Sequence, residues 1–266
     1  MIAWLVLFTI GLPWLGALLI WLLPERQTHR QHVLAVIFSV AAGLSGLALL
    51  PNAHENPAIS LPMGSVFGDF TFVPDGLGVF IAVIATVVGS LAVIFSVDYM
   101  AHHAEQLRRY YVLVLLFIGT MAGLGLAGNL LLMFLLWEVT ALCSYALISF
   151  HNDDPKAVAG GLKALIITQI GGVGLLVGAL ICYAYLGTYQ INQILAEAHT
   201  LPAGVLSALA FGFLVAAAAK SAQVPLHTWL PDAMEAPTPI SALIHAATMV
   251  NAGVYLLARF YPAFEH

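Results

Sequence analysis

Long apolar stretches separated by short polar segments recur along the whole chain. Each stretch runs for about 20 residues, which is the length that an α-helix needs to cross the hydrocarbon core of a bilayer. The pattern predicts eight membrane-spanning helices, at about residues 2–23, 31–50, 76–97, 110–127, 129–150, 160–186, 203–224 and 239–260. The expected fold is therefore an all-α polytopic membrane protein.

The segment 51–75 interrupts this pattern between the second and third helices. It is rich in Pro, Gly and polar residues, so it is not expected to cross the membrane. The pieces 59–61 and 67–72 resemble two short strands joined by a turn. The segment therefore predicts a small β-hairpin outside the membrane that covers one end of the helices.

The seventh helix carries the strongest backbone signal of the chain. Pro225 removes a backbone N–H and its ring clashes with the preceding turn, and three more prolines follow, at Pro231, Pro237 and Pro239. Helix seven is therefore predicted to be broken. Irregular backbone at membrane depth must be satisfied by protein or by a water-filled cavity, so a polar cavity is expected near residues 220–230.

Composition supports the membrane assignment and excludes other classes. The chain has 266 residues, of which 61% are hydrophobic and only 8% are charged, whereas a soluble domain has roughly 25% charged residues. A net charge of -5 with eight Lys and Arg residues cannot form the basic surface that nucleic-acid binding requires.

No motif indicates a cofactor or a metal. The sequence shows no Gly-rich dinucleotide fingerprint after a strand, no P-loop, no clustered cysteines and no paired histidines at haem spacing. Cys143 and Cys182 both lie in apolar runs, which favours packing over a disulfide or a four-ligand metal site. The chain itself is expected to carry out no redox chemistry.

The basic residues of the short polar segments predict the orientation in the membrane. They follow the first, third and fifth helices, at Arg26, Arg30, Arg108, Arg109, Lys156 and Lys163. Basic loops stay on the cytoplasmic side. The N-terminus and the acidic segments 51–75 and 187–202 are therefore expected outside, in a cell inner membrane.

Glu138 is the first candidate for chemistry. It lies in the middle of the fifth apolar stretch, and at about 1.5 Å per residue this places it near the bilayer midplane. A charge there costs roughly 2.5–3.5 kcal/mol, which proteins accept with a partner or for a function. The alternative interpretation is a neutral, hydrogen-bonded structural glutamate.

Lys220 is the second candidate, because a cation lies just before the predicted break at Pro225. Desolvation favours the neutral amine, whereas a nearby carboxylate favours the ammonium. If Glu138 is that carboxylate, a change in its charge would switch Lys220 between holding and releasing a proton. The alternative is a static ion pair between the two residues.

Two histidines could continue a proton path. His245 lies in the eighth apolar stretch between Ser241 and Thr248, which would form a polar stripe on one helix face. His227 lies next to the predicted break and could line water. Each could equally be a satisfied core histidine.

The region around these residues resembles a known family. The segments 129–138, 220–225, 227–239 and 241–257 closely resemble the antiporter-like subunits of complex I and of Mrp cation/proton antiporters. The resemblance covers residues 60–262. It implies that Glu138, Lys220 and His245 are the glutamate, the broken-helix lysine and the relay histidine of the family's proton pathway.

The resemblance also implies a domain organisation. The family is built from two inverted repeats of five helices, and residues 110–262 resemble the first repeat, preceded by three helices in residues 1–109. The second repeat does not follow in this sequence. The chain is therefore expected to be a fragment or one half of a split subunit.

The choice within the family rests on a few positions. Large antiporter-like subunits of complex I commonly carry an Arg and an Asp where this chain has Gln169 and Gly172, and the glycines Gly171 and Gly172 look more like the Mrp A subunit. Asn251 departs from the lysine that is usual in the Mrp A subunit.

The expected function is that of one subunit in a multisubunit membrane complex that exchanges sodium ions for protons. The alternatives are a proton-pumping subunit of a complex I-type oxidoreductase or a related hydrogenase, a membrane scaffold that transports nothing, and a membrane enzyme with its own cofactor. Expected partners are other membrane subunits, lipid, protons and sodium ions.

Overall fold

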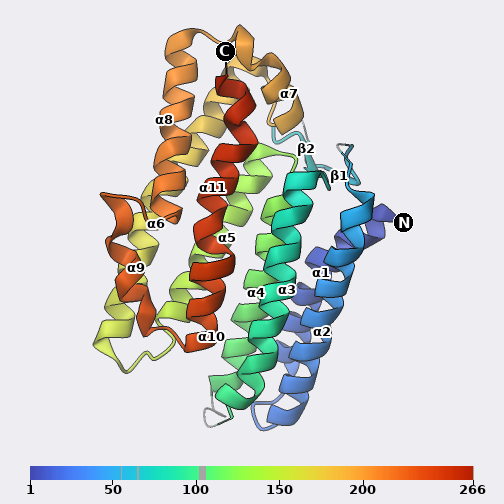
Figure 1. Cartoon of the computed structure of the whole chain (residues 1–266), viewed down its shortest axis with the longest axis vertical. Coiled ribbons are helices and arrows are strands. Elements are labelled where there is room, and N and C mark those ends of the chain that lie inside the picture. The colour runs from blue at the N-terminus through green and yellow to red at the C-terminus, as the bar shows by residue number, and fades with distance from the viewer. Residues whose placement is uncertain (55, 65, 102–105, 266) are drawn as a thin grey trace.

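The computed structural model describes residues 1–54, 56–64, 66–101 and 106–265. Within these residues eight helical segments are long and apolar enough to cross a membrane (Figure 1). They are α1 (Ile2–Leu22), α2 (Thr28–Leu49), α3 (Gly76–Tyr99), α4 (Leu107–Leu126), α5 (Leu130–Ile148), α6 (Pro155–Leu186), α8 (Ala203–Lys220) and a segmented eighth span, Thr238–Phe264. The predicted class and the eight spans are confirmed.

Local sequence signals set the helix ends. The side chains of Asp75, Asn129 and Asp154 accept backbone N–H groups from the first turns of α3, α5 and α6, as good N-cap residues do. Pro155 occupies the first position of α6, where its missing N–H costs nothing. Gly187 ends the same helix with a φ of +69°, a conformation that glycine adopts without strain.

The predicted hairpin is present and is tied to the bundle. Strands β1 (Ile59–Pro62) and β2 (Asp69–Phe72) pair antiparallel. The N–H of Gly128, between α4 and α5, donates to the carbonyl of Thr71 at 2.9 Å, and the first residue of the short helix α7 (Ile191–Glu197) donates to the carbonyl of Gly128 at 2.9 Å. Backbone hydrogen bonds therefore join three segments at one end of the molecule, called here the hairpin end (Figure 1).

The predicted break after the seventh span is also present. Helix α8 ends at Lys220, and the chain then forms a 3-10 turn (Leu226–Thr228), the short helix α9 (Trp229–Asp232) and a second 3-10 turn (Ala233–Glu235). These pieces lie beside the lower half of α6 (Figure 1). The break therefore spans several turns rather than a single kink.

The eighth span was expected to be one continuous helix and is not. Helix α10 (Thr238–Ser241) leads into a π-helical segment at Ala242–Ala247, and α11 (Met249–Phe260) follows. Thr248 leaves helical geometry, with φ −133° and ψ −80°, and its hydroxyl donates to the carbonyl of Leu243 at 2.6 Å. The threonine hydroxyl thus supplies a donor where the α-helical ladder is interrupted, and such π segments often mark functional sites.

The cations used to predict orientation gather at the end opposite the hairpin. Arg108 pairs with Glu25 at 2.6 Å, and Arg109 donates to the side chain of Asn152 at 3.2 Å. Most of these cations lie in the first turns of helices rather than in loops, because α2, α4 and α6 begin earlier than the hydropathy pattern indicates. The prediction that they share one end of the bundle holds.

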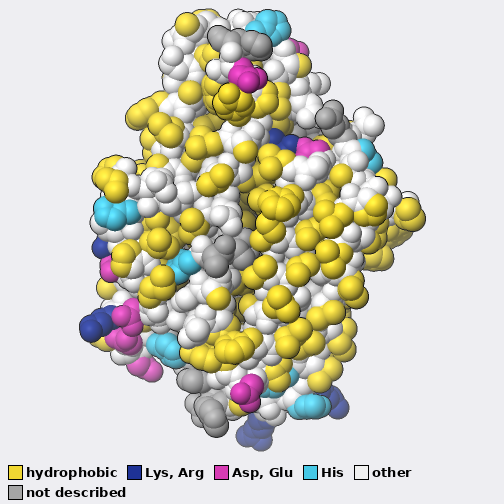
Figure 2. Space-filling view, viewed as in Figure 1, with side chains coloured by type: hydrophobic (Ala, Val, Ile, Leu, Met, Phe, Trp, Pro, Cys, Tyr) yellow, Lys and Arg dark blue, Asp and Glu magenta, His cyan; other side chains and the backbone are white. Residues whose placement is uncertain are grey.

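Helix α4 forms the centre of the bundle and is buried along most of its length. The outer faces of the other helices carry exposed large apolar side chains, among them Trp4, Trp21, Phe80, Phe95, Ile166 and Val173. Apolar side chains are spread over the visible face, and charged ones lie near its two ends and along the left edge, where α9 lies (Figure 2). This distribution suits contact with lipid or with other membrane helices.

An ion pair joins the eighth span to the third. Arg259 of α11 pairs through two nitrogens with both carboxylate oxygens of Asp75, the N-cap of α3, and the exposed fractions of the two side chains are only 10% and 15%. The hydroxyl of Tyr255 accepts from Arg259 at 3.1 Å and donates to the carbonyl of Gly125 at 2.8 Å. One cluster therefore connects α3, α4 and α11.

We expect Asp75→Asn to destabilise the fold strongly. The amide can still cap α3 but leaves the buried guanidinium of Arg259 without a counter-charge, so the free energy of unfolding should fall by about 3 kcal/mol. Asp154→Asn is the matched control, because it also keeps an N-cap and breaks none of the ion pairs that the structure describes; its effect should stay below about 0.5 kcal/mol. Thermal unfolding in detergent measures both, and equal losses would contradict the role given to the ion pair.

Candidate functional site

The structure places Lys220 at the centre of the candidate site. It is the last residue of α8 and is completely buried. Its Nζ donates to the carbonyl of Trp137 at 3.1 Å and to Oγ1 of Thr140 at 2.6 Å, and lies 5.0 Å from the centre of the Trp137 ring. The C-terminal end of α8 also favours a positive charge. A cation is thus held by one turn of α5.

Glu138 lies on the same turn of α5 but faces another helix. Trp137 and Thr140 are three residues apart and share a helix face, whereas the carboxyl group of Glu138 lies against α6. A Cβ atom at Gly172 would collide with Oε1 of Glu138, and the side chain of Gln169 lies close enough to act on the carboxyl group. Among the described residues, Oε1 of Glu138 has no hydrogen-bond partner.

The two charged groups interact without touching. The carboxyl of Glu138 and the amine of Lys220 are close enough for mutual electrostatic interaction. Within the residues that the structure describes, however, they form no ion pair at 4.0 Å or less. Coulomb energy falls only slowly with distance in a low-dielectric interior, so each group feels the charge of the other while neither is fixed by a direct contact.

Small residues on α6 allow this arrangement. Gly171 packs against Ala219 of α8, and Gly174 packs against the backbone of Gly212. Close backbone approach of this kind is typical of small residues between membrane helices. This tight contact between α6 and α8 helps to place the end of α8 near α5.

The turn that ends α8 satisfies its own backbone. Gln223 donates its N–H to the carbonyl of Ala218 at 2.8 Å, and Ala222 donates to that of Ala219 at 3.4 Å, which is a Schellman arrangement. Ala222 adopts a φ of +50°, a left-handed conformation that normally favours glycine. The indole N–H of Trp229 donates to the same Ala219 carbonyl at 2.9 Å.

The cavity beside the break differs from the expected one. A cleft of about 800 Å³ lies between the break and α11, and its lining is mostly apolar, with Ser221 and Gln223 among its few polar residues. The cleft that the described side chains form near residues 220–230 is therefore apolar, whereas a polar cavity was expected there. The physical reason is that the freed carbonyls are satisfied within the turn and by Trp229.

His245 reaches the site through Trp229. The two rings lie edge to face at 6.1 Å, and Trp229 is itself bonded to the carbonyl next to Lys220. Both ring nitrogens of His245 are buried and have no hydrogen-bond partner among the described residues. Thr248 is buried, and its hydroxyl is engaged with the carbonyl of Leu243.

The other two predicted positions lie outside this cluster. His227 and Pro225 are exposed on the surface of the chain, and the structure places neither against Glu138 or Lys220. Pro225 follows the turn that breaks the helix, as expected, but the hydrogen bonds of the turn lie earlier, at residues 218–223. Whether His227 lines water in an assembled protein stays a prediction.

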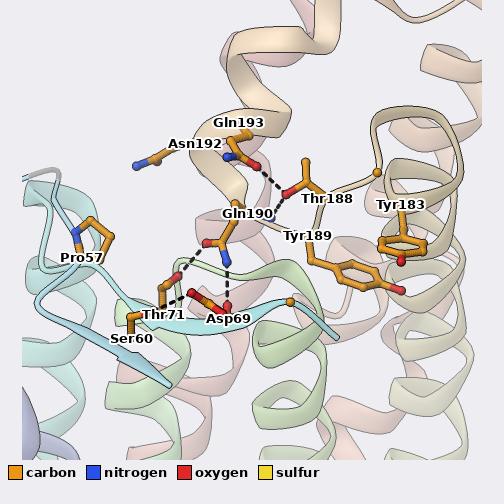
Figure 3. Close-up of a pocket in the computed structure, with 12 residues that line it drawn as sticks. Pro57, Ser60, Asp69, Thr71, Tyr183, Thr188, Tyr189, Gln190, Asn192 and Gln193 are labelled. Atoms are coloured by element: carbon orange, nitrogen blue, oxygen red, sulfur yellow. Dashed lines mark hydrogen bonds between the residues drawn. The ribbon is translucent and has the colours of Figure 1, made fainter. Parts of the chain in front are cut away.

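A second, polar cleft of about 420 Å³ lies at the hairpin end. Gln190 donates to the carbonyl of Asp69 at 2.6 Å and accepts from Thr71 at 2.8 Å, and Ser60 donates to the carboxylate of Asp69 at 3.1 Å (Figure 3). These groups bond to one another across the hairpin and the segment before α7. Their arrangement holds the hairpin against the bundle.

Three residues of the site were not found from the sequence: Trp137, Thr140 and Trp229. Gln169 was named there only for the choice within the family, not as a site residue. The spacing of Trp137 and Thr140 shows that they share a helix face, but it does not show which helix that face meets. Within the described residues no group of three or more His, Cys, Asp or Glu side chains could hold a metal ion.

Comparison with known proteins gives matches over most of the chain. Residues 127–266 match the family described as NADH:quinone oxidoreductase/Mrp antiporter, transmembrane, and residues 61–111 match the N-terminal family of complex I chain 5. The A subunit of a Na⁺/H⁺ antiporter from Alkalihalophilus pseudofirmus is 41% identical over 74% of this chain and 24% of its own length. The L subunit of the NADH-quinone oxidoreductase of Mycobacterium tuberculosis is 36% identical over 96% of this chain and 42% of its own length.

A solved structure shows the same fold. The Mrp complex from a Dietzia species contains a chain that matches 97% of this one with a TM-score of 0.85 and 29% identity. The match covers 28% of that chain. The present chain thus spans between about a quarter and two fifths of the length of these relatives.

We expect Ala222→Gly to stabilise the turn that ends α8. Glycine removes the cost of a Cβ in a left-handed conformation and loses more chain entropy on folding, so the net gain should be about 0.5–1 kcal/mol. Ala218→Gly, inside α8, should instead cost about 1 kcal/mol. Thermal unfolding in detergent compares the two, and a loss in both variants would show that the turn is not strained.

Proposed function

The chain belongs to the NADH:quinone oxidoreductase/Mrp antiporter family, and we propose that it is a subunit of a multisubunit membrane complex that exchanges sodium ions for protons. The observation that carries this proposal is the fully buried Lys220, whose amine is hydrogen-bonded to the turn of α5 that also bears Glu138. A buried cation of this kind is costly and is usually kept for a function.

The proposed switch follows from the separation of the two groups. When Glu138 is ionised, its negative charge stabilises the ammonium of Lys220. When Glu138 takes up a proton, this support is lost and desolvation favours the neutral amine, so Lys220 releases its proton. The imidazole of His245, whose nitrogens have no partner among the described residues, is the proposed next acceptor, with Thr248 near it and His227 at the entry to the path.

We infer the exchanged ions, sodium and protons, from the likeness to the A subunit of Mrp antiporters. The relative from Alkalihalophilus pseudofirmus is named as part of a Na⁺/H⁺ antiporter, and Gln169 and Gly172 stand beside Glu138 in this chain. A proton-pumping subunit of a complex I-type oxidoreductase is the second candidate, because the match to the mycobacterial L subunit extends over 96% of this chain. Flavin and iron–sulfur absorbance in the purified native complex would favour the second candidate.

We also propose the organisation and orientation of the chain. Residues 110–262 form the first five-helix repeat and residues 1–109 a leading unit of three helices. The family matches are likewise separate, at 61–111 and at 127–266. The clustered cations at one end of the bundle support a cytoplasmic location for that end. The hairpin end and the N-terminus then lie outside a cell inner membrane.

Replacement of either charged group should abolish most ion exchange. In the assembled complex, Glu138→Gln and Lys220→Ala should each lower sodium-dependent proton transport at least tenfold, since one fixes a neutral side chain and the other removes the proton carrier. Transport is measured as the collapse of a pH gradient in inverted vesicles on addition of sodium.

The controls separate transport from assembly. Glu197→Gln and Lys156→Ala change exposed residues of the same types and should leave transport near the wild-type rate. The stoichiometry of the purified complex measures assembly. Wild-type transport in both site variants would refute the switch, and loss of assembly rather than of transport would favour a scaffold role.

Cysteine labelling in intact cells tests the orientation. Cys143 and Cys182 are buried, so an impermeant maleimide should react only with introduced thiols. Asn56→Cys, at the hairpin end, should be labelled in intact cells, whereas Asp153→Cys, at the cationic end, should react only after permeabilisation. The reverse pattern would place the N-terminus in the cytoplasm.

A further inference from the structure

The amine of Lys220 forms a closed hydrogen-bonded triangle with two groups of α5. Nζ donates to the carbonyl oxygen of Trp137 at 3.1 Å and to Oγ1 of Thr140 at 2.6 Å. The hydroxyl of Thr140 in turn donates to the same Trp137 carbonyl at 2.7 Å. All three atoms are buried, so the partners that they offer one another cannot be replaced freely by bulk water.

A hydroxyl differs from the other partners of Lys220 because it can both donate and accept. With the ammonium present, Oγ1 accepts from Nζ and gives its own hydrogen to the Trp137 carbonyl. When Lys220 releases one proton to the pathway, the neutral amine gains a lone pair and keeps two hydrogens. Rotation about the Cβ–Oγ1 bond then turns the hydroxyl hydrogen from the Trp137 carbonyl to Nζ, while Nζ donates to that carbonyl.

We propose that Thr140 is a positioning residue that keeps the amine of Lys220 in one place in both of its protonation states. This inference rests on the proposed function. The exchange moves one hydroxyl hydrogen between two acceptors and requires no movement of a heavy atom, so neither state leaves a buried polar group of the triangle unpaired.

The surroundings of Lys220 make this role specific. The titratable groups that act on it are Glu138 and Cys143, both from α5. From α6, Gly171 packs against Ala219, the residue before Lys220. The Trp137 ring lies 5.0 Å from Nζ and offers a cation only its face. Among the described side chains, Thr140 alone is hydrogen-bonded to the amine.

The test compares Thr140→Val with Thr140→Ser in the complete complex. Valine has a similar shape but no hydroxyl, so the ammonium loses an acceptor and the neutral amine loses a donor. Charge-assisted hydrogen bonds are roughly twice as strong as neutral ones, so the ammonium loses more stabilisation than the neutral amine. We expect transport in inverted vesicles to fall about tenfold and the alkaline limb of its pH profile to move about one pH unit lower, since one unit corresponds to a tenfold change in protonation. Serine should restore most of the rate and the wild-type profile.

Thr168→Val is the matched control. Thr168 is also a fully buried threonine, but its hydroxyl donates only to carbonyls of its own helix, α6. Its replacement should leave the pH profile in place. Equal effects of the two valine variants, or a valine variant at position 140 with a wild-type profile, would overturn the inference.

The same experiment separates this inference from the proposed function. Loss of transport in Lys220→Ala together with an unchanged profile in Thr140→Val would refute only the role of Thr140. Wild-type transport in Lys220→Ala would refute the switch and with it the inference. If Thr140→Val does not assemble, Thr140→Ala removes the same hydroxyl, and a wild-type profile in that variant would again overturn the inference.

Discussion

The cost of holding a charged side chain away from water is the constraint on which this structure depends. Lys220 is completely buried at the end of α8, and an isolated ammonium in such a place would be prohibitively unstable. The surrounding structure stabilises the ammonium of Lys220 in three ways. It ends the helix at the lysine, it supplies a carbonyl and a hydroxyl from α5, and it brings a carboxyl group near without contact.

Two acid–base pairs among the described residues, both partly or wholly buried, show contrasting designs. Arg259 and Asp75 are in direct contact, and a tyrosine and a backbone carbonyl continue their network. Such a pair fixes helices to one another. Lys220 and Glu138 interact through space, and each has its own separate polar neighbours. A pair of this second kind can change its charge state without pulling helices apart.

Local features were readable from the sequence, and contacts between distant segments were not. The eight spans, the hairpin and the break after Lys220 follow from apolar length, strand alternation and proline, which are properties of neighbouring residues. The π segment before Thr248 was missed because Ser241, His245 and Thr248 have ordinary helical spacing. The partners of Lys220 were missed because they lie some eighty residues earlier. The apolar character of the cleft beside the break was missed because Trp229 supplies a donor that the sequence does not place.

Glycine at position 172 limits which residues a relative can carry there if its glutamate keeps the same position. The space beside Gly172 is occupied by a carboxylate oxygen of Glu138. A relative with a larger residue there must turn its glutamate elsewhere, and so alter how strongly the acid acts on the lysine. A change of residue at position 172 therefore also changes the position of the Glu138 carboxyl group. Relatives that share the glutamate can therefore differ in how strongly its charge acts on the lysine. The residue at position 172 of α6 indicates which relatives differ.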